Sequence, residues 1–228
     1  MANKKNTNVN EVDRQAKVGE SVSSVEKFFN ENGKTIWICI AVLALVILGA
    51  IAFNKFVTQP KRAEARAQMF PAEQAFQSQQ WEIALKGDGN IAGFEQIIQD
   101  YGSKGGESVY LYAGECALQL GEFEDAISYL KKYDGKDAIL AARALSCEGD
   151  AYVGLGQFEE ALSCFKKAAD KIDNPFAATY LKKAGLVCEE LGKKDEALAL
   201  YKKIKDSYPR SIEGYDIDKY ISRIENAE

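Results

Sequence analysis

The cysteines and acidic residues are the side chains of this chain that could support catalysis or metal binding. The 228 residues include five cysteines and no histidine. Without histidine the chain lacks the usual general base near neutral pH, the Ser-His and Cys-His nucleophile pairs, and imidazole metal ligands. The cysteines stand singly, so neither a zinc site nor a redox motif is predicted. We interpret them as small residues packed in helices, and the sequence leaves open whether any of the last four pair. They are Cys39, Cys116, Cys147, Cys164 and Cys188.

The acidic residues do not form a recognisable catalytic or metal site either. Glu159-Glu160 and Glu189-Glu190 occupy adjacent positions of expected helices, so their side chains point in different directions. Asp88–Asn90 resembles the start of a calcium loop, but its twelfth position is Gln99 and not Glu. We therefore predict no enzyme activity, no cofactor, no metal and no small-molecule substrate. Nucleic acid is also an unlikely partner on charge, because residues 58–228 hold 22 Lys and Arg against 29 Asp and Glu.

A helical element repeated between Glu107 and Pro209 must position these side chains. Each copy has a Leu-Gly turn, and the spacings between the turn glycines are 35 and 36 residues. A glycine lies seven residues before each turn glycine, an alanine five after it, and a large apolar residue nine after it. In chain order these sets are Gly121, Gly156, Gly192; Gly114, Gly149, Gly185; Ala126, Ala161, Ala197; and Leu130, Phe165, Tyr201.

The residue types suit pairs of antiparallel helices. The small residues let the two helices of a unit approach closely, and the turn glycine takes a left-handed conformation that ends the first helix. We expect the aromatic residues after the turn, Phe123 and Phe158, to fill the space between neighbouring units, together with the large residue of the pattern. The sequence therefore predicts an all-α helical solenoid.

This pattern resembles the tetratricopeptide repeat family, whose signature of about 34 residues ends in a proline. Pro209 falls at that place in the third unit, while the family's tryptophan is replaced by Tyr110, Leu145 and Leu181. The resemblance implies a groove, along the first helix of each unit, that binds peptides or partner helices. By the family's positions the groove residues are Leu111, Glu115, Leu118, Ser146, Asp150, Val153, Lys182, Leu186 and Glu189.

The other strong feature is an apolar run from Ile36 to Phe53 within an uncharged stretch. Eighteen helical residues at ~1.5 Å each span about 27 Å, close to the hydrocarbon thickness of a bilayer. Trp37 and flanking lysines suit the two interfaces. A single transmembrane helix is therefore predicted. The alternative is a signal peptide cleaved after Ala52, which the long polar region before the run disfavours.

The predicted parts are a polar tail at 1–34, a transmembrane helix at 35–57 and a repeat domain at 58–228. Within the repeat domain we expect a helical stretch over Lys61–Lys86 with Pro71 as a point where it can bend. The domain divides into a degenerate repeat unit at about 71–101, clear units at about 107–138, 142–174 and 178–209, and a capping helix at 211–226. Ser211 is the expected N-cap of that helix.

This layout resembles the bacterial ancillary subunit of the Sec translocon over roughly residues 20–228. The resemblance implies an inner-membrane protein with a cytoplasmic N-terminus and a periplasmic repeat domain. Translocon subunits, exported polypeptides and periplasmic chaperones are the implied partners. Flanking charge does not decide the orientation, and four cysteines count against an oxidising compartment, so a cytoplasmic repeat domain stays open. A cell-envelope scaffold or assembly adaptor, serving division or outer-membrane machinery, is the alternative function.

Overall fold

The computed structural model describes residues 32–226, so most of the predicted polar tail lies outside the described residues. Helices make up most of the described part, and no strand occurs there apart from an isolated bridge between Gly87 and Ala92. The predicted all-α fold class is therefore confirmed. The chain divides into two compact units, one ending at Gln59 and the other beginning at Pro60. Each unit is described by itself below.

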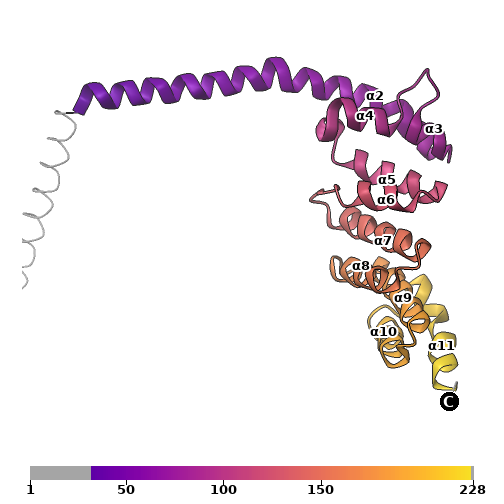
Figure 1. The fold of residues 1–228 in the computed structure, drawn as a ribbon. Coiled ribbons are helices and arrows are strands. Elements are labelled where there is room, and N and C mark those ends of the chain that lie inside the picture. The colour runs from indigo at the N-terminus through magenta and orange to yellow at the C-terminus, as the bar shows by residue number, and fades with distance from the viewer. Residues whose placement is uncertain (1–31, 227–228) are drawn as a thin grey trace, which may run out of the picture. The chain divides into compact units, whose positions relative to one another are not determined.

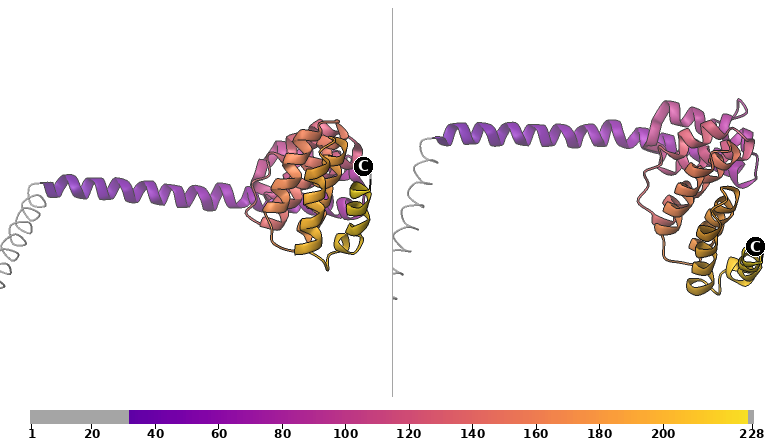
Figure 2. Two further views of the ribbon diagram at one scale, coloured as in Figure 1. Left: turned by 90° about the horizontal axis from the view of Figure 1, so that it is seen from below. Right: turned by 60° about the horizontal axis from the view of Figure 1, so that its bottom comes forward.

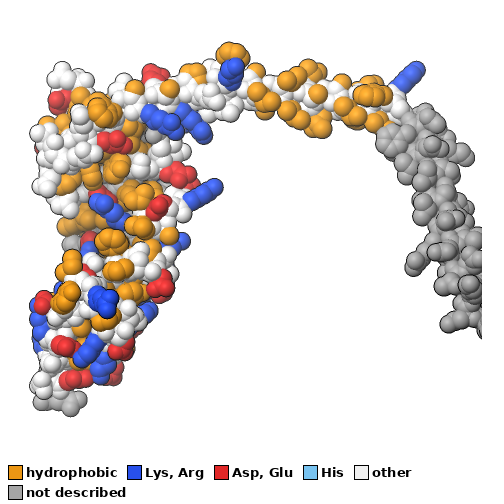
Figure 3. Space-filling view, turned by 180° about the vertical axis from the view of Figure 1, so that it is seen from behind, with side chains coloured by type: hydrophobic (Ala, Val, Ile, Leu, Met, Phe, Trp, Pro, Cys, Tyr) orange, Lys and Arg blue, Asp and Glu red, His pale blue; other side chains and the backbone are white. Residues whose placement is uncertain are grey.

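The first unit is helical from residue 32 through a π-helical turn at Asn54–Thr58 (η1). Figure 3 shows the continuous apolar band along this helix. Its most apolar stretch has none of its residues buried, and Trp37 and Phe53 are 72% and 64% exposed. By length and composition this helix can cross a membrane. Exposure of side chains this apolar to water is unfavourable.

The second unit begins with three helices, α2 (Gln59–Gln77), α3 (Trp81–Lys86) and α4 (Phe94–Tyr101). The helical stretch expected over Lys61–Lys86 is thus two helices, and the break lies at residues 78–80 rather than at Pro71. Gln79 has a φ of 58°, a left-handed conformation that is uncommon for a residue with a Cβ atom. Pro71 stays inside α2, where buried Met69, Ala72 and Ala75 hold the helix against the core.

The Asp88–Asn90 segment between α3 and α4 has a structural explanation. The Oδ1 atom of Asp88 accepts hydrogen bonds from the backbone N–H groups of Asn90 at 2.8 Å and Ile91 at 3.0 Å. These bonds hold the pKa of the Asp88 carboxyl below its ordinary value. The aspartate therefore closes a tight turn, as Asp often does in loops.

The remaining helices form three pairs and a final single helix, which follow one another in chain order in Figures 1 and 2. The pairs are α5 (Ser108–Leu120) with α6 (Phe123–Leu130), α7 (Ala138–Gly154) with α8 (Phe158–Asp170), and α9 (Phe176–Glu190) with α10 (Lys194–Ser207); α11 (Ile212–Glu225) follows. Each helix packs against the next one along the chain, and α5 also packs against α7. This is the helical solenoid that the repeat pattern predicted.

The glycine of each first helix lies against the large residue of the second helix in its own unit. A Cβ atom at Gly114 would lie 2.5 Å from Cγ of Leu130, and one at Gly149 would lie 2.7 Å from Cε1 of Phe165. Gly185 contacts the ring of Tyr201 in the same way. The prediction that glycine permits close helix approach is therefore confirmed. The large residues thus fill space within each unit, and two of them also reach the next element: the ring centre of Tyr201 lies 5.4 Å from that of Tyr220 on α11, and the ring centre of Phe165 lies 5.5 Å from the ammonium group of Lys183 on α9.

The aromatic residue after the turn does reach the neighbouring unit. A Cβ atom at Gly154, the last residue of α7, would lie 2.5 Å from Cζ of Phe123 on α6. The turn glycine is left-handed in all three units, for example with a φ of 77° at Gly121. The backbone N–H of Glu122 then donates to the carbonyl of Ala117 at 2.9 Å, closing a Schellman turn that recurs at the other two glycines.

The final helix covers the apolar end of the array, as predicted. The hydroxyl of Ser211 accepts a hydrogen bond from the N–H of Gly214 at 3.0 Å, which confirms the expected N-cap. Ile217, Ile221 and Ile224 of α11 are buried in the same cluster as Tyr201. The helix therefore removes apolar surface of the last pair from water.

Candidate functional site

The predicted groove residues lie on the first helices of the three pairs. Leu111, Glu115 and Leu118 are on α5, Ser146, Asp150 and Val153 on α7, and Lys182, Leu186 and Glu189 on α9. α5 packs directly against α7. The ammonium group of Lys183 on α9 donates to the hydroxyl of Ser146 at 3.2 Å and to the carboxylate of Asp150 at 2.6 Å. The nine residues therefore occupy neighbouring helices.

Several of these residues are largely buried. Leu111 is 1% exposed and packs in the core, and Ser146 is 3% exposed. Glu115 is 6% exposed although it carries a carboxylate. Val153 and Leu186 are each 38% exposed, so they present apolar surface. The family positions thus lie on the first helices, as the prediction had them, but the side chains of Leu111 and Ser146 are buried.

The three acidic positions are each bound by a basic residue from the next first helix or from α11. Glu115 pairs with Arg143 at 2.5 Å, Asp150 with Lys183 at 2.6 Å, and Glu189 with Arg223 at 2.6 Å. We call these three contacts the ion-pair ladder. Partly exposed pairs of this kind contribute only about 0–1 kcal/mol each to stability. Their larger effect is geometric, because each fixes the position of one unit relative to the next.

Burial dominates the electrostatics of the ladder. The pKa values of the Glu115 and Asp150 carboxyls are raised mainly by loss of solvent, against the opposing pull of Arg143 and Lys183. The carboxylate of Glu115 is the less well satisfied of the two, because its Oε1 atom is buried and has no hydrogen-bond donor. A carboxylate in this position is costly unless it is well paired.

Lys182 is engaged by the capping helix. Its ammonium group lies 5.0 Å from the centre of the Tyr220 ring, and Arg223 and Lys219 lie 5.1 and 5.2 Å from the same ring. Cation–π contacts at such distances contribute about 0.5–1 kcal/mol where they are exposed. Lys182 and Glu189 therefore connect α9 to α11, and the part of the site open to a partner lies further towards α5 and α7.

Two hollows lie along the first helices, and together we call them the groove. The proximal hollow has a volume of about 330 Å³ and the distal hollow about 350 Å³. The proximal hollow is lined by Phe76, Gln77, Gln79, Trp81, Glu115, Leu118, Gln119, Arg143, Cys147 and Asp150. The distal hollow is lined by Asp150, Val153, Phe158, Phe165, Lys183, Leu186, Val187 and Glu190. Because Asp150 lines both, the hollows are adjacent.

The groove combines five predicted residues with several that the family positions missed. Glu115, Leu118, Asp150, Val153 and Leu186 line it, as expected. Three of the missed residues are aromatic and come from outside the first helices: Phe76 from α2, Trp81 from α3 and Phe158 from α8. Their aromatic character was visible in the sequence, but only the fold shows that they border the same surface. The result is an apolar groove whose charged members are largely paired.

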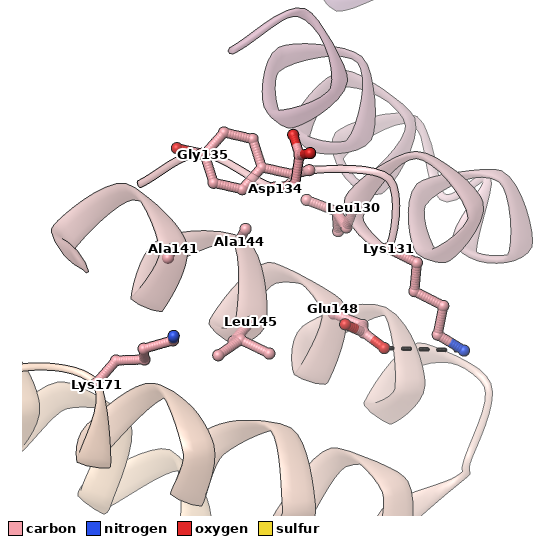
Figure 4. Close-up of a pocket in the computed structure, with 10 residues that line it drawn as sticks. Leu130, Lys131, Asp134, Gly135, Ala141, Ala144, Leu145, Glu148 and Lys171 are labelled. Atoms are coloured by element: carbon pink, nitrogen blue, oxygen red, sulfur yellow. Dashed lines mark ion pairs between the residues drawn. The ribbon is translucent and has the colours of Figure 1, made fainter. Parts of the chain in front are cut away.

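A third hollow, of about 370 Å³, lies elsewhere and contains none of the nine predicted residues. Figure 4 shows it between the end of α6, the start of α7 and Lys171. Lys131 and Glu148 form a long ion pair of 3.9 Å at its edge. Figure 3 likewise shows apolar, basic and acidic side chains interspersed over the visible face of the second compact unit, which holds the repeats. This mixture gives no preference for one class of partner.

The cysteines of the repeat unit are packing residues. Cys116, Cys164 and Cys188 are buried, Cys147 is half-buried, and all four are free thiols. Burial raises the pKa of Cys116 and Cys147 to about 12, and that of Cys164 and Cys188 to about 11. Among residues 32–226, no three acidic or cysteine side chains are placed to hold a metal ion.

We expect the three buried thiols, Cys116, Cys164 and Cys188, to react with Ellman's reagent at neutral pH only as fast as the repeat domain unfolds. The thiolate is the reactive form, and burial disfavours it. The measurement uses the full-length variant with Cys39→Ala and Cys147→Ala in detergent, which removes the exposed and the half-buried cysteine. Adding denaturant should make the three remaining sites react rapidly. Rapid labelling of any of the three in the native chain would contradict the assignment.

The comparisons with known proteins agree with this architecture. Models of the tetratricopeptide repeat match residues 108–134 and 140–210. A crystal structure of MamA protein has a TM-score of 0.56 and 20% identity, covering 72% of this chain and 84% of that chain. Another crystal structure of MamA has a TM-score of 0.43 and 23% identity, covering 57% of this chain and 86% of that chain. None of the curated protein sequences matches this chain.

The similarity to MamA, at this level of identity, concerns the fold. The repeat matches coincide with α5–α6 and with α7–α10, the helices that carry the glycine contacts and the left-handed turns. Tetratricopeptide repeats bind proteins or peptides through their helix surfaces, and the groove lies along the first helices. The chain therefore carries tetratricopeptide repeats in an all-α solenoid, and that solenoid is a protein–protein interaction module.

Proposed function

We propose that this protein is a membrane-anchored module that binds extended segments of polypeptide in the groove. The observation that carries the proposal is the exposure of Val153 and Leu186, each 38% exposed, beside Asp150, which is already paired with Lys183. A partner gains most by covering the apolar surface, at about 25 cal/mol per Å² removed from water. Segments that have not yet folded offer apolar side chains for such contacts.

We further propose that the helix containing Ile36–Phe53 anchors the protein in a bacterial inner membrane. Its length and its unburied apolar side chains support the anchor. The N-terminus would then be cytoplasmic and the repeat domain periplasmic, an orientation that rests on the resemblance to the Sec ancillary subunit. The partners that follow are translocon subunits, exported polypeptides and periplasmic chaperones. An accessory or chaperone-like role at the translocon is the function proposed.

The orientation is tested by a reporter fused after Glu228. Alkaline phosphatase is active only on the periplasmic side, so we expect this fusion to be active. A second fusion, to a reporter that is active only in the cytoplasm, should be inactive. The opposite pattern would place the repeats in the cytoplasm and remove the role in handling exported polypeptides.

The partner is tested by placing a photo-crosslinking amino acid at Val153 and at Leu186 in the full-length protein in membranes. We expect adducts with translocon subunits or newly exported chains. Recovery of a division or outer-membrane assembly complex in their place would support the alternative, a cell-envelope scaffold. A crosslinker at Tyr215, which is 79% exposed on α11 and lies outside the groove, is the control.

Substituting Leu186 by Asp should abolish crosslinking at Val153 while leaving the fold intact. The charge would replace apolar surface in the distal hollow, whereas the side chain is already 38% exposed. The matched control is Leu140→Asp, because Leu140 is 37% exposed and lines neither hollow. Circular dichroism checks the fold of both variants. Equal loss of crosslinking in the two would show that the groove is not the contact surface.

A further inference from the structure

Glu115 has an unmet hydrogen-bonding requirement. Its Oε2 atom accepts from Nη2 of Arg143 at 2.5 Å, while its Oε1 atom is buried without any donor. Among the described residues 32–226, this is the one buried side-chain oxygen or nitrogen atom that has no hydrogen-bond partner. A buried polar atom left in this way costs free energy, because it has lost its hydrogen bonds to water. An incoming donor would recover that free energy.

The surroundings of Glu115 narrow the kind of donor. Glu115 lines the proximal hollow together with Asp150 and Arg143, so two carboxylates and one guanidinium group border the same space. The rings of Phe76 and Trp81, whose centres are 5.2 Å apart in an edge-to-face contact, form its aromatic wall. Aromatic faces attract cations, and charged donors form stronger hydrogen bonds to carboxylates than neutral donors do.

The side chain of Arg143 is the element that can move. It is 53% exposed, whereas the side chain of Glu115 is 8% exposed. Turning Arg143 towards water gives up its hydrogen bond to Oε2 of Glu115, and an incoming cation would replace that bond. Such a movement would let a second cation approach Glu115 from the hollow without exposing the core.

We propose that the proximal hollow binds an arginine or lysine side chain of the polypeptide held in the groove. The cationic head donates to Glu115, and the methylene stem lies against Phe76 and Trp81. The amides of Gln77 and Gln119 border the hollow and suit the polar backbone of an extended chain. This inference rests on the proposed function, since it names the side chain that one part of the groove selects.

The other ligand classes fit less well. An acidic side chain would face Glu115 and Asp150, both of which would repel it. A neutral amide could donate to Oε1 of Glu115 but would lack the charge that strengthens the bond. The distal hollow, bordered by Val153, Phe158 and Leu186, suits an apolar side chain instead. The preferred segment therefore has a basic residue near an apolar one.

The test uses the full-length protein in detergent and three fluorescent ten-residue peptides of alternating Leu and Ala. One central position is Arg, its neutral isostere citrulline, or Glu. We expect the Arg peptide to bind about tenfold more tightly than the citrulline peptide, and the Glu peptide to bind most weakly. Glu115→Gln should remove the difference between Arg and citrulline. The matched control, Glu124→Gln on α6, should leave it unchanged.

The outcomes separate this inference from the proposed function. Equal affinity for the Arg and citrulline peptides, with Leu186→Asp still weakening both, would overturn the inference and leave the groove intact. Failure of all three peptides to bind, or binding that Leu186→Asp does not weaken, would overturn the proposed function as well. If Glu115→Gln does not fold, Trp81→Leu replaces it and should reduce the Arg preference. An unchanged preference in that variant would count against the cationic site.

Discussion

Replacing Phe165 by Ala is expected to lower the free energy of unfolding of the repeat unit by about 3–5 kcal/mol. Phe165 is 1% exposed and packs against Gly149 within the second helix pair. Removing the ring leaves a cavity that glycine cannot fill, since it has no side chain. Urea unfolding of the full-length protein in detergent, followed by circular dichroism, measures the loss.

The contact between Gly149 and Phe165 predicts a strong coupling between the two positions. Gly149→Ala alone should cost about 1–3 kcal/mol, because its Cβ atom would lie 2.7 Å from a ring that is 1% exposed. In the Phe165→Ala background the same methyl group has room, so Gly149→Ala should be neutral or stabilising there. Additive effects would show that the glycine does not set the distance between the helices.

The same packing explains why the fold could be predicted from the sequence. Gly114, Gly149 and Gly185 each oppose a large residue sixteen positions later. A glycine so placed has one structural reason, close approach of two helices, and its recurrence fixes the repeat length. Pro71 misled the prediction because α2 continues through it. The break lies at Gln79, whose left-handed conformation has no strong signal in the sequence.

The groove was harder to predict than the fold. Family positions identified Val153 and Leu186, but they could not show that Leu111 and Ser146 are buried. The cations of the ion-pair ladder were missed because they do not share a position in the repeat. Arg143 lies six residues before its unit's glycine and Lys183 two residues before. Pairing of this kind depends on how the units are rotated against one another, which the spacing of small residues does not specify.

The second large effect is expected at the pair of Glu115 and Arg143 in the ion-pair ladder. Arg143→Met should destabilise the repeat unit by about 1–3 kcal/mol at neutral pH, because Glu115 would then keep its buried charge without any donor. Met preserves the apolar part of the arginine stem, so the loss reports mainly on the charge and the hydrogen bond. The measurement is again urea unfolding of the full-length protein.

This deficit should shrink as the pH falls, and the direction follows from the pKa of Glu115. Burial raises that pKa above its ordinary value in the folded chain, so the folded state binds the proton more tightly than the unfolded state. Stability from this group is therefore gained as the pH falls through the folded-state pKa, and it is fully present below the unfolded value of about 4.3. Without Arg143 the folded-state pKa rises further, so the variant gains more than the wild type.

The double variant Glu115→Gln with Arg143→Met isolates the cause. Gln has no charge to bury, so the double variant should be more stable than Arg143→Met at neutral pH and should lose the extra pH dependence. A deficit in Arg143→Met that stays constant from neutral pH to about pH 4 would mean that lost packing, not the buried carboxylate, causes the effect. That result would also weaken the cationic site, because both arguments require Glu115 to be charged and short of a donor in the folded chain.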